Sequence, residues 1–456
     1  MAKGVSPAPL QDASTIDFVP SWNRPDVIVA SYNVLAQALV RRNIFDYASK
    51  AALKWKSRRK RLMEELVELS ASETTPAADT IFCFQEMDHY DDFWAAALHD
   101  ELGLVSEYMP KPGKADGSAI AFHPDRWNLV ERIDISFDDL AEVMRAEVEA
   151  SGQIDATEAA AFEAEVLTRH NVGLIVVLEH SSRPDAKLIV YTGHLFWNPR
   201  YPFIKLVQVD YLLAALDAVA ARYPPDYTVV LAGDFNLTPD NTVFRLMVEP
   251  DAAQLIDTIP GRAFMPPADH FSPRAASLNV IKSITLNEMA ASGADIPPPE
   301  ELHPTADVPL HVRDHRERKA PELLKSLAAC PRLVAPYGAY CQAYKAATGR
   351  CPVTDYATPD LRIPTSSFPL YTTFCGDLNL CLDHILLWRP PSHGQGSPRL
   401  CPTHLLAIPT VVALNSQTGL PNDERGSDHV PIAVGFSTTP CTCGAAYAAP
   451  PPLARA

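Results

Sequence analysis

The feature that most constrains the fold of this chain is a series of short apolar runs that each end in a polar side chain. The four clearest runs are DVIVASYN (26–33), DTIFCFQEMD (79–88), AKLIVYTGH (186–194) and YTVVLAGDFN (227–236), with polar residues Asn33, Glu86, His194, Asp234 and Asn236. Runs of this length and character are typical of buried strands. Sheets that pack face to face bring such strand ends to one rim, so we expect these side chains to lie close together.

Further runs predict a mixture of strands and helices. GSAIAFHP (117–124), NVGLIVVLE (171–179), LCLDHILLW (380–388) and HVPIAVGF (429–436) are also typical of strands. Apolar residues spaced three and four apart predict helices over residues 53–69 and 203–220. Thr238 and Pro239 predict the N-cap and first turn of a short helix that follows. Because several strands follow one another without a helix, we expect an α/β fold of two mixed, mainly antiparallel sheets with helices outside.

The order of these elements indicates one domain with tails and insertions. The domain is predicted over residues 25–437. The polar, Pro-containing residues 1–24 are expected to form a disordered tail, and residues 438–456 form a Pro/Ala-rich tail. An Ala- and Glu-rich stretch at about 137–168 predicts an inserted helical pair. A Pro-rich stretch at about 260–365 predicts an irregular insertion with short helical pieces such as PELLKSLAA.

Composition limits the compartment and the partners. Lys and Arg total 39 against 55 Asp and Glu, a net charge of −16, so long-range attraction to a nucleic acid is not expected, although a local basic site is compatible with this balance. The nine cysteines form no CxxC pair, which favours reduced thiols in the cytoplasm, the nucleus or both. No apolar run reaches about 18 residues and no signal-peptide core is present, so no membrane partner is expected.

One basic run stands out in this acidic chain. It lies in the helix predicted over residues 53–69 and consists of Lys54, Lys56, Arg58, Arg59, Lys60 and Arg61. A solvated helix face explains the run as well as any function does. The functional alternatives are a track for an RNA backbone and a nuclear import signal.

The polar strand ends carry the chemical signal. Carboxylates, amides and imidazoles gathered at one rim would suit a hard divalent cation such as Mg²⁺, and the sequence has no zinc-type cluster of Cys and His. Each residue alone has a structural explanation, since Asn33 suits a turn, Glu86 a helix cap and His194 a packed core. Asp234 and Asn236 are the pair for which such an explanation is weakest.

Two stretches contain the pattern Gly-Asp-x-Asn. The first, LAGDFNLTPD (231–240), follows a strongly apolar strand and precedes a predicted helix, and we expect it to carry chemistry. In the second, FCGDLNLCLD (374–383), Asp377 and Asn379 fall in a predicted loop, and Asp383 is the residue expected to matter.

Six motifs together resemble one known family. They are SYNVLAQ, FCFQEMD, TGHLFWNPRYPFIKLVQ, LAGDFNLTPD, LCLDHILL and GSDHVPIAVGF, in that order. They are similar to motifs of the endonuclease/exonuclease/phosphatase superfamily, and within it to the carbon-catabolite-repressor-type, deadenylase-like exonucleases. The phrasing is most similar to the fungal Ngl-type RNA exonucleases. The resemblance implies a DNase I-like, four-layer α/β/β/α sandwich and Mg²⁺-dependent phosphodiester hydrolysis, with Mn²⁺ as the alternative metal.

The resemblance also implies a metal-binding set. Glu86 would be the principal ligand, assisted by Asn33. Asp234 would activate the attacking water and lie at the metal, with Asn236 beside it holding metal or the scissile phosphate. His429 would stabilise the charge that develops at phosphorus or hold a second metal. Such roles suit phosphoryl transfer, which needs charge neutralisation and an in-line nucleophile.

The remaining catalytic and substrate-binding residues follow from the same resemblance. His194 would donate to the phosphate, Asp383 would orient a neighbouring histidine, and Asp428 would support His429. The predicted substrate-binding set is Asn171, His194, Pro199, Arg200, Lys205, Asn236 and Leu378, and Lys111 and Lys114 are further candidates to meet phosphates.

Several positions depart from the family pattern. Leu378 and Thr373 stand where a deadenylase has an adenine-stacking Phe and an Asn, which puts a strong poly(A) preference in doubt. His384 replaces a usual Tyr, and Gly193 replaces a usual Asn. Docking through a leucine-rich-repeat region is not expected.

The sequence therefore predicts a monomeric 3′→5′ exoribonuclease that trims single-stranded RNA or shortens poly(A). One alternative is a phosphatase or phosphodiesterase acting on a small phosphorylated molecule. The other is a catalytically dead RNA-binding scaffold, which would be expected to lack Glu86, Asp234 or His429, and the chain has all three.

Overall fold

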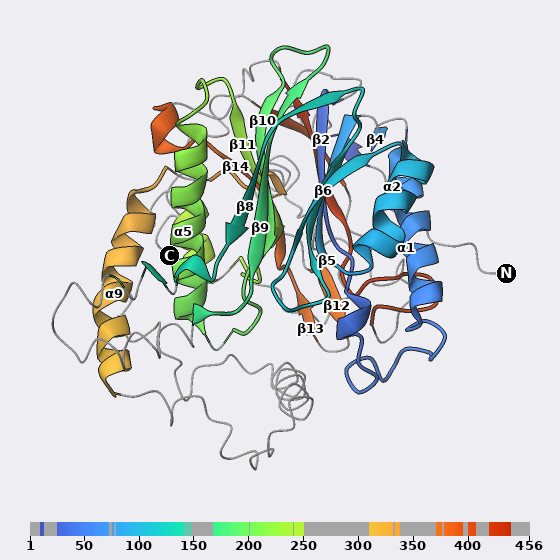
Figure 1. Cartoon of the computed structure of the whole chain (residues 1–456), viewed down its shortest axis with the longest axis horizontal. Helices are drawn as coiled ribbons and strands as arrows, with labels where there is room; N and C mark the ends of the chain where they lie inside the picture. The colour runs from blue at the N-terminus through green and yellow to red at the C-terminus, as the bar shows by residue number, and fades with distance from the viewer. Residues whose placement is uncertain are drawn as a thin grey trace, which may run out of the picture.

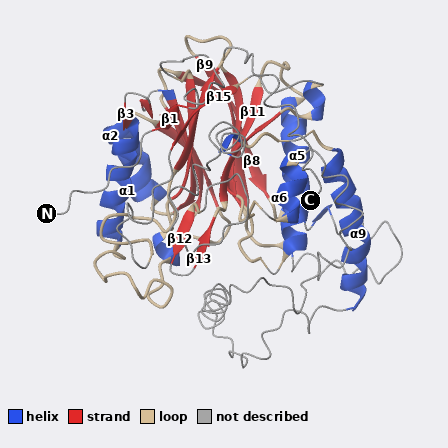
Figure 2. Cartoon of the chain, turned by 180° about the vertical axis from the view of Figure 1, so that it is seen from behind, coloured by secondary structure: helices blue, strands red, loops and turns tan. Residues whose placement is uncertain are grey.

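The computed structural model describes the chain in segments that together make a four-layer sandwich (Figure 1). These segments are residues 10–12, 25–72, 75–76, 79–140, 142–143, 146, 167–199, 201–239, 241–249, 310–331, 333–337, 371–375, 378–394, 400–406 and 419–438. Two sheets pack against each other, and helices cover the outer face of each sheet (Figure 2). Among the described residues, no helix has the length and apolar character needed to cross a membrane.

The first sheet has seven strands. Their order is β1 (Leu10–Asp12), β15 (Cys401–Leu406), β16 (Ile432–Ser437), β2 (Val27–Asn33), β5 (Thr80–Met87), β7 (Gly117–Phe122) and β6 (Val105–Pro110). All neighbours are antiparallel except β2 and β5, which are parallel. The outer layer of this sheet comprises α1 (Trp55–Ser70), the π-helical turn η4 (Tyr90–Trp94) and α2 (Ala95–Leu102). A short hairpin, β3 (Ala71–Ser72) with β4 (Thr75–Pro76), follows α1.

The second sheet has five strands. Their order is β14 (Asp383–Trp388), β11 (Thr228–Asp234), β10 (Lys187–His194), β9 (Val172–His180) and β8 (Trp127–Ser136). Here too a single neighbouring pair, β10 with β11, is parallel. Its outer layer comprises α5 (Pro202–Ala220), α6 (Thr242–Val248) and α9 (Leu310–Ala329). A separate hairpin joins β12 (Thr373–Cys375) to β13 (Leu378–Leu380), and short 3₁₀ turns lie at η2 (Gln37–Leu39) and η6 (Pro391–His393).

Three apolar clusters correspond to the three interfaces between the layers. One lies between α1, α2 and the first sheet, and includes Leu62, Leu66 and Phe82. The second lies between the two sheets. The third lies between the second sheet and α5, α6 and α9. Because both faces of the central strands are covered, these strands are apolar throughout, as the sequence predicted, and the predicted α/β/β/α sandwich is confirmed.

The two parallel pairs place the polar strand ends. In each pair a helix connects the strands, giving the units β2–α1–β5 and β10–α5–β11. Parallel strands end at the same edge of their sheet. Asn33, Glu86, His194 and Asp234 therefore lie at the carboxyl ends of the two parallel pairs, where such sheets commonly bind ligands.

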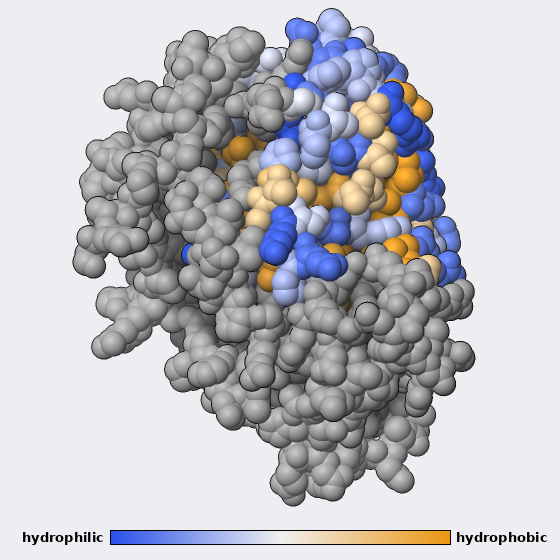
Figure 3. All heavy atoms as spheres, turned by 90° about the vertical axis from the view of Figure 1, so that its left-hand side faces the viewer, coloured by the Kyte–Doolittle hydropathy of each residue, from blue (hydrophilic) through white to orange (hydrophobic). Residues whose placement is uncertain are grey.

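Two segments differ from the sequence-based expectation. Residues 10–12, predicted to lie in a disordered tail, form β1 and pair with β15. Within the insertion predicted over 260–365, α9 is longer than the short helical pieces expected, and its apolar residues Ala320, Leu323, Leu324 and Leu327 pack against the core beside α5. Figure 3 shows that hydrophilic and hydrophobic groups are mixed on the described part of the surface on this side of the molecule. Most of the insertion predicted at 137–168 lies outside the described residues.

The N-cap of α6 also differs from the prediction. The helix begins at Thr242, and the side chain of Asn241 accepts a hydrogen bond from the Val243 N–H at 2.9 Å. Thr238, the predicted cap, instead contributes its backbone carbonyl to a turn that receives the Asn241 N–H. Asn is a strong N-cap residue because its side-chain oxygen satisfies an otherwise unpaired N–H of the first turn.

The capping geometry predicts different effects for two alanine variants. Asn241→Ala should lower the free energy of unfolding by about 1 kcal/mol, the typical value for a lost N-cap. Thr238→Ala is the matched control and should change it by less than about 0.5 kcal/mol. Denaturant titrations of the wild type and both variants measure the difference. Equal destabilisation by both variants would contradict the assignment of the cap.

Candidate active site

The polar strand ends meet in one aligned row across the second sheet. His194, the last residue of β10, pairs in register with Asp234, the last residue of β11. Asp234 in turn pairs with Asp383, the first residue of β14. Three residues from three strands therefore occupy neighbouring positions at one edge of the sheet. The sequence predicted this, because each residue lies at the end of an apolar run or beside one.

The side chain of Asn33 connects this row to the first sheet. Its Nδ2 donates to Oε1 of Glu86 at 3.0 Å and to Oδ2 of Asp234 at 3.1 Å. The other oxygen of Glu86 accepts from the Ala36 N–H at 3.2 Å, and Oδ1 of Asn33 accepts from the Leu35 N–H. One amide group thus holds two carboxylates from different sheets within reach of each other.

The direction of the Glu86 side chain depends on a bulge in β5. Gln85 already points into the space between the sheets, where its Nε2 donates to Thr192 Oγ1 at 2.9 Å. In a regular strand the next side chain would point to the opposite face. Here the register between β5 and β7 shifts between Phe84 and Met87, and Glu86 has a φ of 55°. This left-handed conformation, unusual for Glu, turns its carboxylate to the rim.

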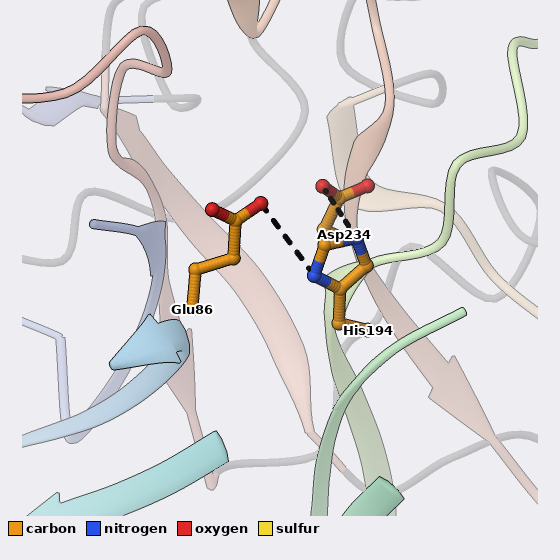
Figure 4. A group of neighbouring side chains, drawn as sticks. All are labelled: Glu86, His194 and Asp234. Carbon is orange, nitrogen blue, oxygen red and sulfur yellow. Dashed lines mark ion pairs between the residues drawn. The ribbon is translucent and has the colours of Figure 1, made fainter. Parts of the chain in front are cut away.

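His194 lies between the two carboxylates (Figure 4). Its Nδ1 is 3.7 Å from Oε1 of Glu86, and its Nε2 is 3.6 Å from Oδ2 of Asp234. These distances are longer than hydrogen bonds. Burial lowers the pKa of His194 to about 3, more than the Asp234 charge raises it, so the ring is neutral near pH 7. A neutral ring can donate one hydrogen bond to a group that enters the site.

His429 has the opposite electrostatic environment. Its Nδ1 lies 2.7 Å from Oδ2 of Asp383, and the hydroxyl of Thr372 donates to the same oxygen at 2.5 Å. Burial lowers the pKa of His429, but the carboxylates of Asp383, Asp428 and Asp234 outweigh it and raise the pKa well above its usual value. The site therefore combines one neutral and one positively charged imidazole at neutral pH.

Asp428 does not take the position predicted for it. No hydrogen bond joins its carboxylate to the ring of His429 among the described residues, and Asp383 occupies that place. The backbone carbonyl of Asp428 accepts from the Phe374 N–H at 2.8 Å and from the Thr373 hydroxyl at 3.3 Å. Asp428 supports the site through its backbone and its charge.

The donor set suits a divalent cation. One group of possible ligands is Glu86, His194 and Asp234, and a second is Asp234, Asp383 and His429, with the atoms of each group within 4.8 Å of one another. Burial, followed by the charge of Asp428, raises the pKa of Glu86 to about 7. Buried carboxylates this close together are stabilised in their charged form by a cation, and oxygen ligands favour hard ions. We therefore find that the residues fit a divalent metal.

The sequence comparison identifies the family. A model of the endonuclease/exonuclease/phosphatase family matches residues 30–429. The chain belongs to this family. The matched span includes each residue of the row and both histidines.

Curated relatives within the family share part of the chain. Carbon catabolite repressor protein 4 homolog 4 of Arabidopsis thaliana is 30% identical over 242 residues, covering 49% of this chain and 56% of that protein. The CCR4-Not complex 3′-5′-exoribonuclease subunit Ccr4 of Yarrowia lipolytica is 28% identical over 270 residues, covering 52% and 36%. Protein angel homolog 2 of Danio rerio is 27% identical over 444 residues, covering 92% and 67%. The chain spans only part of the first two relatives.

A solved structure agrees with the fold. The crystal structure of ANGEL2, a 2′,3′-cyclic phosphatase, in complex with adenosine-2′,3′-vanadate has a TM-score of 0.55 and 22% identity to this chain. The match covers 90% of this chain and 95% of ANGEL2. At this identity the similarity concerns the fold, and it agrees with the sandwich described here.

Two predicted substrate-binding residues form hydrogen bonds to backbone groups beside the row. Lys205 is buried, and its Nζ donates to the carbonyl of Asn236 at 2.5 Å, so its contact with phosphate stays a prediction. Burial lowers its pKa to about 7. The Nδ2 of Asn171 donates to the carbonyl of His194 at 2.8 Å, and its Oδ1 accepts from Gln208. Both residues position backbone beside the row.

Asn236 lies at the rim as predicted. Its N–H donates to Oδ1 of Asp234 at 2.9 Å, its Nδ2 donates to the Leu195 carbonyl, and its φ is 50°. Asn tolerates this left-handed conformation better than most residues. Of the other predicted substrate contacts, Pro199 is half-buried. Arg200 and the side chain of Leu378 lie outside the described residues.

The remaining predicted phosphate contacts lie in the turn between β6 and β7. Lys111 pairs with Asp116 at 2.5 Å, and its charge lowers the pKa of Glu86. Lys114 is exposed in the same turn. Asn379, expected in a loop, lies in β13, and Asp377 is outside the described residues.

Two departures from the family pattern have structural explanations. A Cβ on Gly193 would lie 2.1 Å from the Tyr191 hydroxyl, and a Cβ on Gly233 would lie 2.4 Å from the Gly193 carbonyl, so neither position has room for a side chain while Tyr191 keeps its place. The ring of His384 is buried against Phe244, and its Nε2 lies 2.7 Å from the Leu237 carbonyl. Neither Gly193 nor His384 contributes a group to the rim.

Arg58 is a supporting residue that sequence reasoning placed on the surface. It is fully buried, and its guanidinium donates to the carbonyls of Val34 and Leu35, to Gln37 Oε1 at 3.1 Å and to the Gly426 carbonyl at 2.7 Å. The first two carbonyls follow Asn33 in the chain, and Gly426 lies three residues before His429. A single guanidinium therefore holds both the loop that follows Asn33 and the loop that precedes His429.

Glu65, two turns further along α1, also holds the loop at Gly426. We refer to the contacts of Arg58 and Glu65 together as the clamp. Its Oε1 accepts from the Gly426 N–H at 3.3 Å, and its Oε2 accepts from the Tyr32 hydroxyl at 2.6 Å. A Cβ on Gly426 would lie 2.6 Å from Leu62 Cγ and 2.9 Å from the Arg58 carbonyl, so only glycine allows the loop to approach α1 this closely. Arg58 and Gly426 are 368 residues apart in the chain, so the sequence contained no signal for the contact between them.

The clamp predicts that Arg58 controls turnover without contacting substrate. Arg58→Lys and Arg58→Met should lower kcat by about tenfold to a hundredfold, because small misplacements of reacting groups are costly. KM should change little. Arg59→Met is the matched control, since Arg59 is half-exposed over the Phe93 ring and makes none of these contacts. Steady-state kinetics below each variant's melting temperature provide the measurement, and a folded Arg58→Met protein with wild-type kcat would contradict the positioning role.

Proposed function

We propose that this protein is a divalent-metal-dependent phosphodiesterase that removes nucleotides from the 3′ ends of single-stranded RNA. The observation that carries the proposal is the pair of buried carboxylates, Glu86 and Asp234, held by the single amide of Asn33 beside a neutral and a charged imidazole. Such an arrangement offers positive charge, a proton acceptor and hydrogen-bond donors around one point, which is what phosphoryl transfer requires.

Each residue has a proposed task. A divalent cation bound by Glu86, with Asp234 and the amide-bearing residues nearby, would neutralise phosphate charge and lower the pKa of a bound water. Asp234 accepts the proton of the attacking water. Asn236 orients the phosphate beside it. Mg²⁺ is the proposed ion, because the ligands are mainly oxygens, and Mn²⁺ is the alternative.

The two histidines have separate tasks in this proposal. His194, neutral because it is buried, donates one N–H to a phosphate oxygen. His429, kept positively charged by Asp383, stabilises the charge that develops at phosphorus. Asp383 is in turn fixed by the hydroxyl of Thr372, so the charged imidazole is already aimed before substrate enters.

The direction of cleavage and the polymer are supported by the names of relatives. The Yarrowia lipolytica Ccr4 subunit is a 3′-5′-exoribonuclease, and a Schizosaccharomyces pombe relative, 30% identical over 221 residues, is a probable RNA exonuclease. We propose the same polarity here, by a monomer acting in the cytoplasm, the nucleus or both. Thr373 is buried and hydrogen bonded to the Asp428 carbonyl, so it is not directed at a base, and we propose only a modest preference for poly(A).

A second candidate is removal of a terminal 2′,3′-cyclic phosphate from RNA. The alignment with protein angel homolog 2 of Danio rerio extends over 92% of this chain, and the ANGEL2 structure is that of a 2′,3′-cyclic phosphatase. Both reactions begin with attack of water on a phosphorus at the 3′ end of RNA, so one set of rim residues serves either. The two differ in the bond that breaks and therefore in the product.

Metal dependence is the first prediction of the proposed function. Glu86→Gln keeps the shape of the side chain but removes its charge, so it should abolish measurable turnover and weaken Mn²⁺ binding observed by electron paramagnetic resonance. Excess EDTA should inactivate the wild type, and added Mg²⁺ should restore it. Glu107→Gln is the control, because Glu107 lies in the edge strand β6 and pairs with Arg132. Full activity of wild type in excess EDTA would contradict the metal mechanism.

Substrate choice is the second prediction. With 20-mers of A, U and mixed sequence, initial rates should differ by less than about tenfold, since aromatic stacking worth roughly 1–3 kcal/mol is not expected at residues 373 and 378. Duplex RNA should resist attack. Each 20-mer is supplied with a 3′-hydroxyl or a 2′,3′-cyclic phosphate end, and products are separated by length. Progressive shortening supports the exonuclease, whereas loss of the cyclic phosphate at constant length supports the second candidate.

A further inference from the structure

A second basic feature lies beside the active site and was not apparent as a unit in the sequence. In residues 37–56 the cations Arg41, Arg42, Lys50, Lys54 and Lys56 are all exposed, and Asp46 is the one acidic residue in the segment. The whole chain carries a net charge of −16. Within the described residues, none of these five cations forms an ion pair. An uncompensated positive segment on an acidic protein indicates attraction to an anionic partner.

The structure divides the basic run Lys54–Arg61 between different tasks. Arg58 is buried in the clamp described above, and Lys60 pairs with Glu64 at 3.4 Å. Arg59 lies over Phe93, and Arg61 is largely buried, 3.9 Å from Asp423. Only Lys54 and Lys56 remain available from that run, and they join the three cations of the preceding loop. The run is therefore neither one solvated helix face nor one continuous signal.

The segment 37–56 is fixed next to the catalytic rim. It begins four residues after Asn33, and its apolar residues Phe45, Ala48 and Leu53 form a small cluster with Leu35 and Cys375. The Tyr47 hydroxyl donates to the Leu420 carbonyl, and the Ser49 hydroxyl donates to Asp423 at 2.9 Å. In Figures 1 and 2 this loop lies at the same lower end of the sandwich as β12 and β13. The cations are thus presented by an anchored loop.

Two of the cations are themselves held by the loop. Nη1 of Arg41 donates to the Ala38 carbonyl at 2.6 Å, and Nη1 of Arg42 donates to the Ala48 carbonyl. Each arginine is restrained on one side while its side chain stays exposed to solvent. The ammonium groups of Lys50, Lys54 and Lys56 have no hydrogen bond or ion pair with described residues, so they can be neutralised without removing an internal contact.

We propose that residues 37–56 form a binding surface for the phosphate backbone of the RNA, upstream of the 3′ end that lies in the active site. This inference rests on the proposed function for the identity of the polymer. Single-stranded RNA is the polyanion whose end must reach Glu86 and Asp234, and the segment begins four residues after Asn33, the last residue of β2. Binding through phosphates is independent of sequence, which agrees with the absence of an expected base-stacking aromatic at residue 378.

Salt dependence of RNA binding tests the surface directly. A fluorescent 20-mer is titrated with the Glu86→Gln protein, so that hydrolysis does not interfere, at several salt concentrations. Adding Lys50→Gln, Lys54→Gln and Lys56→Gln together should weaken binding at least about tenfold at 0.1 M salt. The slope of log affinity against log salt should become less steep by about 2, since each phosphate contact contributes roughly 0.7. A tetranucleotide should lose far less affinity than the 20-mer.

The matched control neutralises three cations at the opposite ends of the strands. Arg126, Lys187 and Arg222 pair with Asp79, Asp226 and Glu131, and Lys187 begins the strand that ends at His194. Changing these three to Gln should leave the salt slope and the affinity within about twofold. An equal loss of RNA affinity in both triple variants would overturn the proposal, because the loss would then follow from the change in net charge and not from the position of the cations.

The design separates this inference from the proposed activity. RNA bound with the expected slope by a wild-type protein that cleaves no RNA end would uphold the surface and refute the nuclease. Cleavage of RNA with an unchanged salt slope in the Lys50/Lys54/Lys56 variant would refute the surface and uphold the nuclease. If that variant lost only nuclear accumulation and kept its RNA affinity, the segment would be an import signal and the proposal would be wrong.

Discussion

The site depends on one amide group that bridges the two sheets. Sheets in a sandwich are held together mainly by apolar packing, which tolerates small shifts of one sheet over the other. The Nδ2 of Asn33 removes that freedom at the rim, because it donates to a carboxylate of its own sheet and to one of the opposite sheet. The approach of Glu86 to Asp234, and the place of His194 between them, follow from this bridge. A buried pair of carboxylates is otherwise repulsive, and the shared donor offsets part of that repulsion.

Support for the bridge comes from the outer helical layer. Arg58 and Glu65 reach from α1 to the residues around Asn33 and to the loop that precedes His429, and Gly426 makes the approach possible. Removing one partner from such a buried charged network leaves unpaired carbonyls and carboxylates, which is costly. A helix that contains no rim residue therefore contributes to the geometry of the rim. This arrangement explains why Arg58 is fully buried although it lies within a run of basic residues.

Much of the architecture could be predicted because its signals are local. The apolar runs that end in polar residues predicted β2, β5, β10 and β11 and the rim residues on them. The order of six motifs indicated the family. The errors arose where a residue's partner is distant in sequence. His429 adjoins Asp428 in the chain, yet Asp383 from another strand holds its ring. The sequence could not reveal that Lys205 points inward. Nor could it reveal that Glu86 is turned to the rim by a bulge.

The position of β16 determines when the complete set of site residues can exist during synthesis of the chain. β2, which carries Asn33, pairs on one side with β5 and on the other with β16, whose strand begins three residues after His429. Contacts between residues so distant in sequence form late, because closing the intervening chain costs entropy. A nascent chain that ends before His429 holds Asn33, Glu86 and Asp234 but lacks both that histidine and the strand that pairs with the free edge of β2. The full set of rim residues therefore comes together only once β16 has emerged from the ribosome and paired with β2.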